Sequence, residues 1–261
     1  MLPCLKHGGY PQQTCDGSGL DRIENASYTT YAYLPSYADL VSYSYNTFPH
    51  DTEQPSKDDL QPHLQYFSEL IEEFGLGKTF AIHLLHKHWT LPQCKAIYGE
   101  QQTATISFWM SGPTAFDDIT LSKTRPHNIC VSPDGKLITS EFRAGNVPGV
   151  NIDPKFVAGF IKRIQDHKLE KIFGLQALPE EDAILREVVF ETCAVMLDTK
   201  DVASRVEGID TGWRVDEGKR EMTAYETHTI IDGKHVPVNA GAPRSSWQVE
   251  SCLREKGYLI S

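Results

Sequence analysis

The sequence contains no apolar run close to the roughly 20 residues that a membrane-spanning helix requires. Its first residues, MLPCLKHGGYPQQ, also have no continuous apolar segment of the kind found in secretory signal peptides. These two absences predict a cytoplasmic protein that has no membrane partner.

Basic residues are scarce. The chain has 25 Lys and Arg against 35 Asp and Glu, which gives a formal net charge of −10. The densest basic segment, IKRIQDHKLEK at 161–171, has the spacing of one charged face of a helix. Nucleic-acid binding requires clustered positive charge to neutralise phosphates, so we expect no nucleic-acid partner.

Paired cysteines and known catalytic motifs are also missing. None of the six cysteines forms a CxxC pair, which in a cytoplasmic protein predicts reduced thiols. Of these, Cys94 lies nearest to a group of histidines and is a candidate thiolate ligand. Glycine-rich nucleotide loops, GxSxG and HExxH are absent, so function has to be sought in individual side chains.

The composition is that of a folded protein, with 40% hydrophobic and 23% charged residues in a chain of 261. No internal repeat or change in composition marks a boundary. We therefore predict a single domain over residues 1–261, in which residues 1–35 form an irregular N-terminal arm rich in Gly, Pro and Tyr.

Three helices are indicated. Over residues 56–77 an apolar stripe recurs at helical spacing, after Ser56 as a candidate cap. Residues 151–171 begin with Asp153 and Pro154, a typical helix start, and residues near 245–257 form a short third helix.

The remaining periodicity is that of strands. We predict strands at 80–89 and 103–110, a strand in preference to a buried helix at 184–199, and hairpins at 128–143 and 225–238. The hairpins turn at 133–135 and 232–233, both rich in turn residues. Together these elements predict an α+β fold, a mostly antiparallel sheet with a few helices packed on one face.

The segment FAIHLLHKHWTL, residues 80–91, contains three of the ten histidines, His83, His86 and His88. On a strand, side chains alternate between the two faces, so His86 and His88 are expected to share one face and His83 to point the other way. Two neighbouring imidazoles suit a divalent metal such as zinc or iron.

Further ligands are available elsewhere in the chain. Glu226 and His228 share a face of another predicted strand and would complete a metal site with His86 and His88. Glu100, Glu141 and His127 are additional candidates for the third ligand. A catalytic set would consist of His86, His88 and Glu100. Metal-free acid–base catalysis by one histidine, or purely structural hydrogen bonding, remain alternatives at this point.

The HxH pair is a feature of the cupin motif, in which a carboxylate follows about four residues later. Here Glu100 lies twelve residues after His88, so the motif is not matched.

The segment LLHKHW is similar to one in a set of uncharacterised filamentous-fungal proteins that carry L-L-H-[RK]-H-[FW]. In those proteins the segment follows a helix ending in FGL and precedes a Gly-Glu pair; here these elements are EEFGLGKTFAIHLLHKHW and YGE. The resemblance covers about 30 residues and implies a fungal cytoplasmic protein with a role in specialised metabolism. It implies no particular activity, and the gap between His88 and Glu100 is longer than expected.

Two functions are therefore consistent with the sequence. The first is an enzyme that processes a small molecule and uses the histidine-rich segment as a metal site or as a general acid or base. The second is a non-catalytic protein that binds a small molecule or acts as an accessory, in which the histidines are structural. The sequence indicates no oligomeric state.

Overall fold

The computed structural model describes residues 35–50, 55–145, 152–178, 183–204, 206–216, 218–230, 238 and 245–260. Nearly all of the predicted N-terminal arm and the turn predicted at 232–233 lie outside the described residues. No helix in the described part of the chain is long and apolar enough to cross a membrane.

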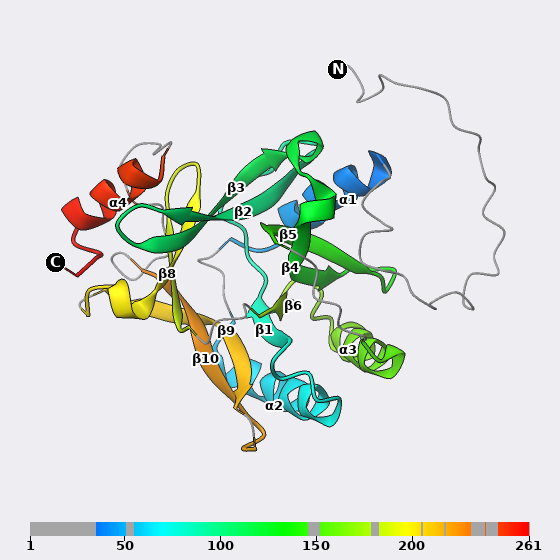
Figure 1. The fold of residues 1–261 in the computed structure, drawn as a ribbon. Helices are drawn as coiled ribbons and strands as arrows, with labels where there is room; N and C mark the ends of the chain where they lie inside the picture. The colour runs from blue at the N-terminus through cyan, green and yellow to red at the C-terminus, as the bar shows by residue number, and fades with distance from the viewer. Residues whose placement is uncertain are drawn as a thin grey trace.

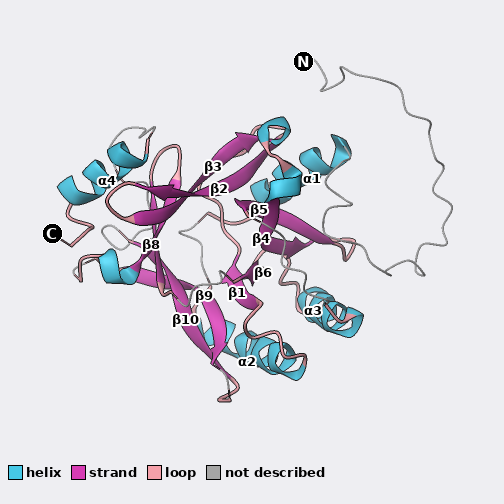
Figure 2. Cartoon of the chain, viewed as in Figure 1, coloured by secondary structure: helices cyan, strands magenta, loops and turns pink. Residues whose placement is uncertain are grey.

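Ten strands in the described part of the chain close into a barrel (Figures 1 and 2). They are β1 (Phe80–Leu84), β2 (Lys95–Thr103), β3 (Ser107–Ala115), β4 (Thr124–Val131), β5 (Leu137–Ala144), β6 (Phe173–Ala177), β7 (Leu185–Val189), β8 (Ala194–Asp198), β9 (Gly208–Asp216) and β10 (Glu221–Thr229). Their order around the barrel is β1-β6-β4-β5-β2-β3-β8-β7-β10-β9. The barrel closes because β9 pairs with β1, where Ile82 lies opposite Trp213.

The predicted fold class is wrong, because the sheet is closed and has no single helix-covered face. Between described strands, eight pairings are antiparallel, and two, β10 with β7 and β2 with β5, are parallel. Closure depends on pairings between segments far apart in the chain, and local periodicity contains no information about those pairings.

The described helices cover several sides of the barrel (Figure 1). They are α1 (Pro35–Asn46), α2 (Lys57–Glu73), α3 (Pro154–Asp166) and α4 (Ser246–Glu255), with short 3-10 turns at Phe116–Asp118, Leu121–Lys123 and Thr199–Asp201. Helix α1 contacts β2 and β5, whereas α2 contacts β1, β9, β10 and α3. Helix α4 shares a hydrophobic cluster with β7 and β8.

The three predicted helices are confirmed, and their ends follow from local chemistry. The Ser56 hydroxyl accepts a hydrogen bond from the Asp59 amide at the start of α2, and Asp153 does the same for Lys155 at the start of α3. Both helices bury their apolar stripe, in which Phe67 and Phe160 pack with ring centroids 5.3 Å apart.

The side chains of β1 face the opposite sides from those expected, so that His83 points into the barrel. Its residues Phe80, Ile82 and Leu84 belong to the hydrophobic cluster that includes α2 and α3, outside the barrel. The intervening residues Ala81 and His83 therefore face the interior. All five residues of the strand are buried, so the apolar pattern did not distinguish the two faces.

Other strand predictions have mixed outcomes. The hairpin at 128–143 is confirmed by the antiparallel pair β4–β5, whose turn contains Gly135 at φ +78°. The strand predicted at 80–89 ends at Leu84, so His86 and His88 lie beyond it. The segment at 184–199 is two strands, β7 and β8, and β10 pairs with the preceding β9 and with β7.

Register shifts in two strand pairs, β4–β5 and β9–β10, alter which side chains point into the barrel. In β4 the pairing skips His127, and in β10 it skips Tyr225. Such bulges place an extra residue on one strand and can bring consecutive side chains to the same side. His127 and its neighbour Asn128 both line the interior cavity.

Candidate metal centre

The loop that leaves β1 carries His86 and His88 to one end of the barrel interior. Helix α1 and the residues after it hold this loop in place: the Tyr45 hydroxyl accepts a hydrogen bond from the His88 amide at 3.2 Å, and the Pro49 carbonyl accepts one from the Lys87 amide at 3.0 Å. Lys87 Nζ donates to the Asn46 carbonyl at 2.7 Å. The loop is therefore fixed by hydrogen bonds to the segment 45–49, although it belongs to no strand.

His86 has a defined tautomer. Its Nδ1 lies 2.8 Å from the Leu84 carbonyl oxygen, which can only accept a hydrogen bond. Nδ1 therefore carries the proton, and Nε2 keeps the lone pair that a metal requires. His86 is buried, with 6% of its surface exposed.

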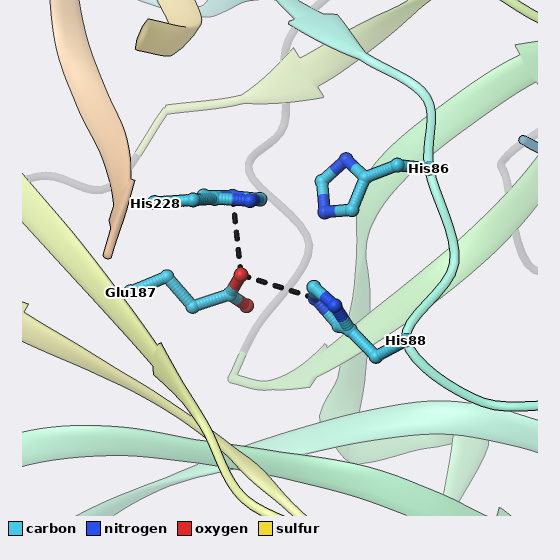
Figure 3. Close-up of side chains that lie close together, drawn as sticks. All are labelled: His86, His88, Glu187 and His228. Carbon is cyan, nitrogen blue, oxygen red and sulfur yellow. Dashed lines mark ion pairs between the residues drawn. The ribbon is translucent and has the colours of Figure 1, made fainter. Parts of the chain in front are cut away.

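Glu187 of β7 lies between two further histidines. Its Oε2 atom is 3.0 Å from His88 Nε2 and 3.1 Å from His228 Nε2, and all three side chains are at least nine-tenths buried. Figure 3 shows both contacts. The His86 ring lies across the space between the three other side chains, on the side opposite Glu187. The His86 and His228 ring centroids are 4.3 Å apart.

These four side chains lie close enough together to form a candidate metal site. One ligand atom from each of His86, His88, Glu187 and His228 lies within 4.8 Å of the others. Two donors on a tetrahedral zinc ion are about 3.4 Å apart, because each metal–donor bond is about 2.1 Å. Imidazole nitrogen and carboxylate oxygen are ligands for zinc and iron, so these buried groups can hold a metal ion.

A second group, His83, Glu226 and His228, adjoins the first and shares His228 with it. Glu226 Oε1 lies 3.4 Å from His83 Nδ1 and 3.6 Å from His228 Nε2. Its other oxygen accepts a hydrogen bond from Gln176 Nε2 at 2.9 Å. The Tyr225 hydroxyl donates to Gln176 Oε1 and so fixes the orientation of that amide. Glu226 thus contacts partners on β1, β6 and its own strand β10.

The cluster lines a small cavity inside the barrel, with a volume of about 20 Å³. Glu141 and Arg143 reach this space from β5, and Asn128 Nδ2 donates to Glu141 Oε2 at 2.9 Å. The cavity is lined by His83, His86, Ile97, Gly99, Trp109, Ser111, His127, Asn128, Glu141, Phe142, Arg143, Glu187, Met196, Glu226 and His228.

Burial and mutual repulsion shift the ionisation of these groups. Burial, reinforced by the Glu187 carboxylate, raises the pKa of Glu226 to about 8 and that of Glu141 to about 7. Burial also lowers the pKa of His83 well below its ordinary value, and His86 and His88 add to the effect. Without an added cation the cavity therefore favours neutral side chains, and a bound cation would favour carboxylate ionisation.

The structure brings together most, but not all, of the residues singled out in the sequence. His86, His88 and His228 converge, Glu226 lies beside them, and His83, expected on the far side, faces the same interior. Glu141 and His127 line the cavity.

Two other candidates lie elsewhere. Glu100 is exposed on β2, where it accepts a hydrogen bond from the Tyr98 hydroxyl at 3.0 Å. Cys94 Sγ lies 3.5 Å from Asp39 Oδ1 and belongs to neither ligand group among the described residues.

Glu187 was missed by the sequence analysis. The signal available was a carboxylate inside the apolar run of β7, LREVV, which becomes an interior candidate ligand only once β7 pairs with β10. In that parallel pair Glu187 lies opposite His228, which places the two side chains together.

Comparisons of the chain with protein-family models, with curated proteins and with solved structures find no match.

Proposed function

We propose that the protein is an enzyme that processes a small molecule at a divalent metal, zinc or iron, held by His86, His88, Glu187 and His228. The observation that carries this proposal is the convergence of four buried ligand atoms from three separate segments, all within 4.8 Å of one another. Imidazole and carboxylate are the ligands of catalytic zinc and non-haem iron sites, and beside four such protein ligands a five- or six-coordinate metal keeps a position open for a substrate.

The charge of the cavity supports the same proposal. Its described lining contains three carboxylates, Glu141, Glu187 and Glu226, and one permanent cation, Arg143. When all are ionised, the net charge is −2, which a divalent cation balances. Buried charges are otherwise costly, because the low dielectric constant of the interior disfavours an uncompensated ion.

Other side chains around the site would orient the ligands or transfer a proton. The Leu84 carbonyl orients His86, and Gln176 holds Glu226 beside His83 and His228. Glu141 faces the cavity, held by Asn128, and is placed to accept or donate a proton on a bound substrate. When bound, a divalent metal polarises a substrate oxygen or activates water.

The test is the metal content of the purified protein, followed by titration of metal-stripped protein with Zn²⁺ and Fe²⁺. We expect about one equivalent of metal per chain, and loss of most of it in His86→Ala, His88→Ala and His228→Ala. His167→Ala is the matched control, since His167 is exposed at the end of α3, away from the cluster.

A protein that purifies without metal and binds neither ion after titration would contradict the proposal. The non-catalytic binding function would then be the better interpretation of the cavity. Equal metal loss in the His167→Ala control would also contradict the assignment of the ligands.

A further inference from the structure

Arg143 lines the cavity but is not one of the proposed metal ligands. Only 5% of its surface is exposed, although arginine is almost never buried without a paired anion. Its Nη1 atom is buried and has no hydrogen-bond partner among the described residues. No described carboxylate forms an ion pair with it, and the Glu141 and Glu226 charges act on it only from a greater distance.

The guanidinium is stacked on an aromatic ring and lies beside two small residues of the cavity lining. Its central carbon lies 4.9 Å from the centroid of the Trp109 ring, a cation–π contact that covers one face. On the neighbouring strands, Gly99 pairs with Arg143, and Ser111 pairs with Gly99. Both positions line the cavity with small residues, so no bulky side chain from these two positions covers the guanidinium.

We propose that Arg143 anchors the carboxylate of a small monocarboxylic acid inside the barrel, beside the metal centre. This inference rests on the proposed small-molecule function and names its substrate class. A guanidinium binds a carboxylate through two parallel N–H···O hydrogen bonds in its own plane, and stacking on Trp109 leaves that plane accessible. A bound carboxylate would also supply the missing partner of Nη1.

The cavity favours a carboxylate over a phosphate. Glu141, Glu187 and Glu226 already line it, so each additional negative charge is repelled at short range. A phosphate group brings nearly two charges at neutral pH, whereas a carboxylate brings one. A planar carboxylate also matches the two-pronged geometry of arginine.

The experiment is a titration of the purified full-length protein with acetate, with acetamide as the neutral isostere and with inorganic phosphate, followed by ligand-observed NMR. We expect acetate to bind at least tenfold more tightly than either comparison ligand. Arg143→Lys keeps the charge but removes the paired donors, and should weaken acetate binding at least tenfold without lowering metal content. Arg163→Lys is the matched control, because Arg163 also stacks on an aromatic ring, Tyr66, but does so outside the barrel.

Ser111→Leu is a second variant, in which Arg143 is unchanged. The larger side chain fills the cavity and should also abolish acetate binding. This variant keeps the test valid if Arg143→Lys fails to fold. Equal binding of acetate and acetamide, unchanged acetate binding in these variants, or tighter binding of phosphate would each overturn the inference.

Metal analysis separates this inference from the proposed function. Acetate binding that depends on Arg143 in a protein without metal would keep the anion site and reject the metal centre. Metal binding without acetate binding would keep the metal centre and reject the anion site.

Discussion

At the level of single residues, the carboxylates of Glu187 and Glu226 differ in their distances to the histidines and in their other hydrogen-bond partners. Glu187 Oε2 contacts two histidine nitrogens, at 3.0 and 3.1 Å, in the group that also contains His86. Glu226 uses one oxygen for Gln176 and lies farther from its histidines, at 3.4 and 3.6 Å. We infer that Glu187 is a direct ligand and that Glu226 orients the histidines around it.

This difference predicts unequal effects of two isosteric substitutions. Glu187→Gln should purify without metal, because an amide is a much poorer ligand than a carboxylate. Glu226→Gln should still bind one equivalent at saturation, with an affinity reduced by about 10–100-fold, as is typical of groups that orient ligands. Metal titration followed by elemental analysis measures both. The opposite ranking would place the metal in the group formed by His83, Glu226 and His228.

At the level of elements, helix α4 packs on the barrel through a hydrophobic cluster and is also joined to it by the Glu250 carboxylate. Glu250 accepts hydrogen bonds from the Thr105 amide at 2.7 Å and from Arg254 Nε at 2.8 Å, and also from the Thr105 hydroxyl. Burial opposes ionisation of Glu250, but these hydrogen bonds outweigh it and lower the pKa to about 2. The ionised carboxylate therefore links α4 to the turn between β2 and β3.

The attachment predicts a pH dependence of stability. A carboxyl group whose pKa is lower in the folded state stabilises the protein above its ordinary pKa of 4.5, and this contribution is lost as the pH falls toward 2. Glu250→Gln should lower the melting temperature at pH 7 and reduce the difference between pH 6 and pH 3. Glu255→Gln, at an exposed position of the same helix, should keep the wild-type pH profile. Identical profiles for Glu250→Gln and wild type would show that this contact does not stabilise α4.

At the level of the whole molecule, the proposed metal links parts of the chain that are distant in sequence. His86 and His88 follow β1, Glu187 lies in β7, and His228 lies in β10. An ion bound to all three segments would stabilise the closed barrel over any state in which these segments separate.

Metal removal should therefore lower the melting temperature. A ligand present at 100 times its dissociation constant stabilises a fold by about 2.7 kcal/mol. For a domain of this size, that corresponds to a shift of roughly 5–10 °C. Scanning calorimetry before and after chelation, and after return of Zn²⁺, measures the shift. His88→Ala should melt at the same temperature with and without added metal, and a chelation shift that persisted in this variant would place the stabilising ion elsewhere.

Local chemistry in the sequence determined the helices and one hairpin. Capping residues and apolar stripes define α2 and α3, and the turn at 133–135 defines the pair β4–β5, because each signal involves residues within a few positions of one another. The ligand types were also visible, since His86, His88 and His228 stand out among only ten histidines.

Tertiary structure alone decided the closure of the barrel and the composition of the site. Whether β1 turns His83 or Ile82 inward depends on where α2 and α3 pack, and a strand buried on both faces carries no pattern that reveals it. Glu187 joins the histidines only through the parallel pairing of β7 with β10, and Arg143 enters the cavity only because β5 lies beside β2. These neighbours are separated by long stretches of chain, and side-chain alternation specifies the faces of a strand but not its partner.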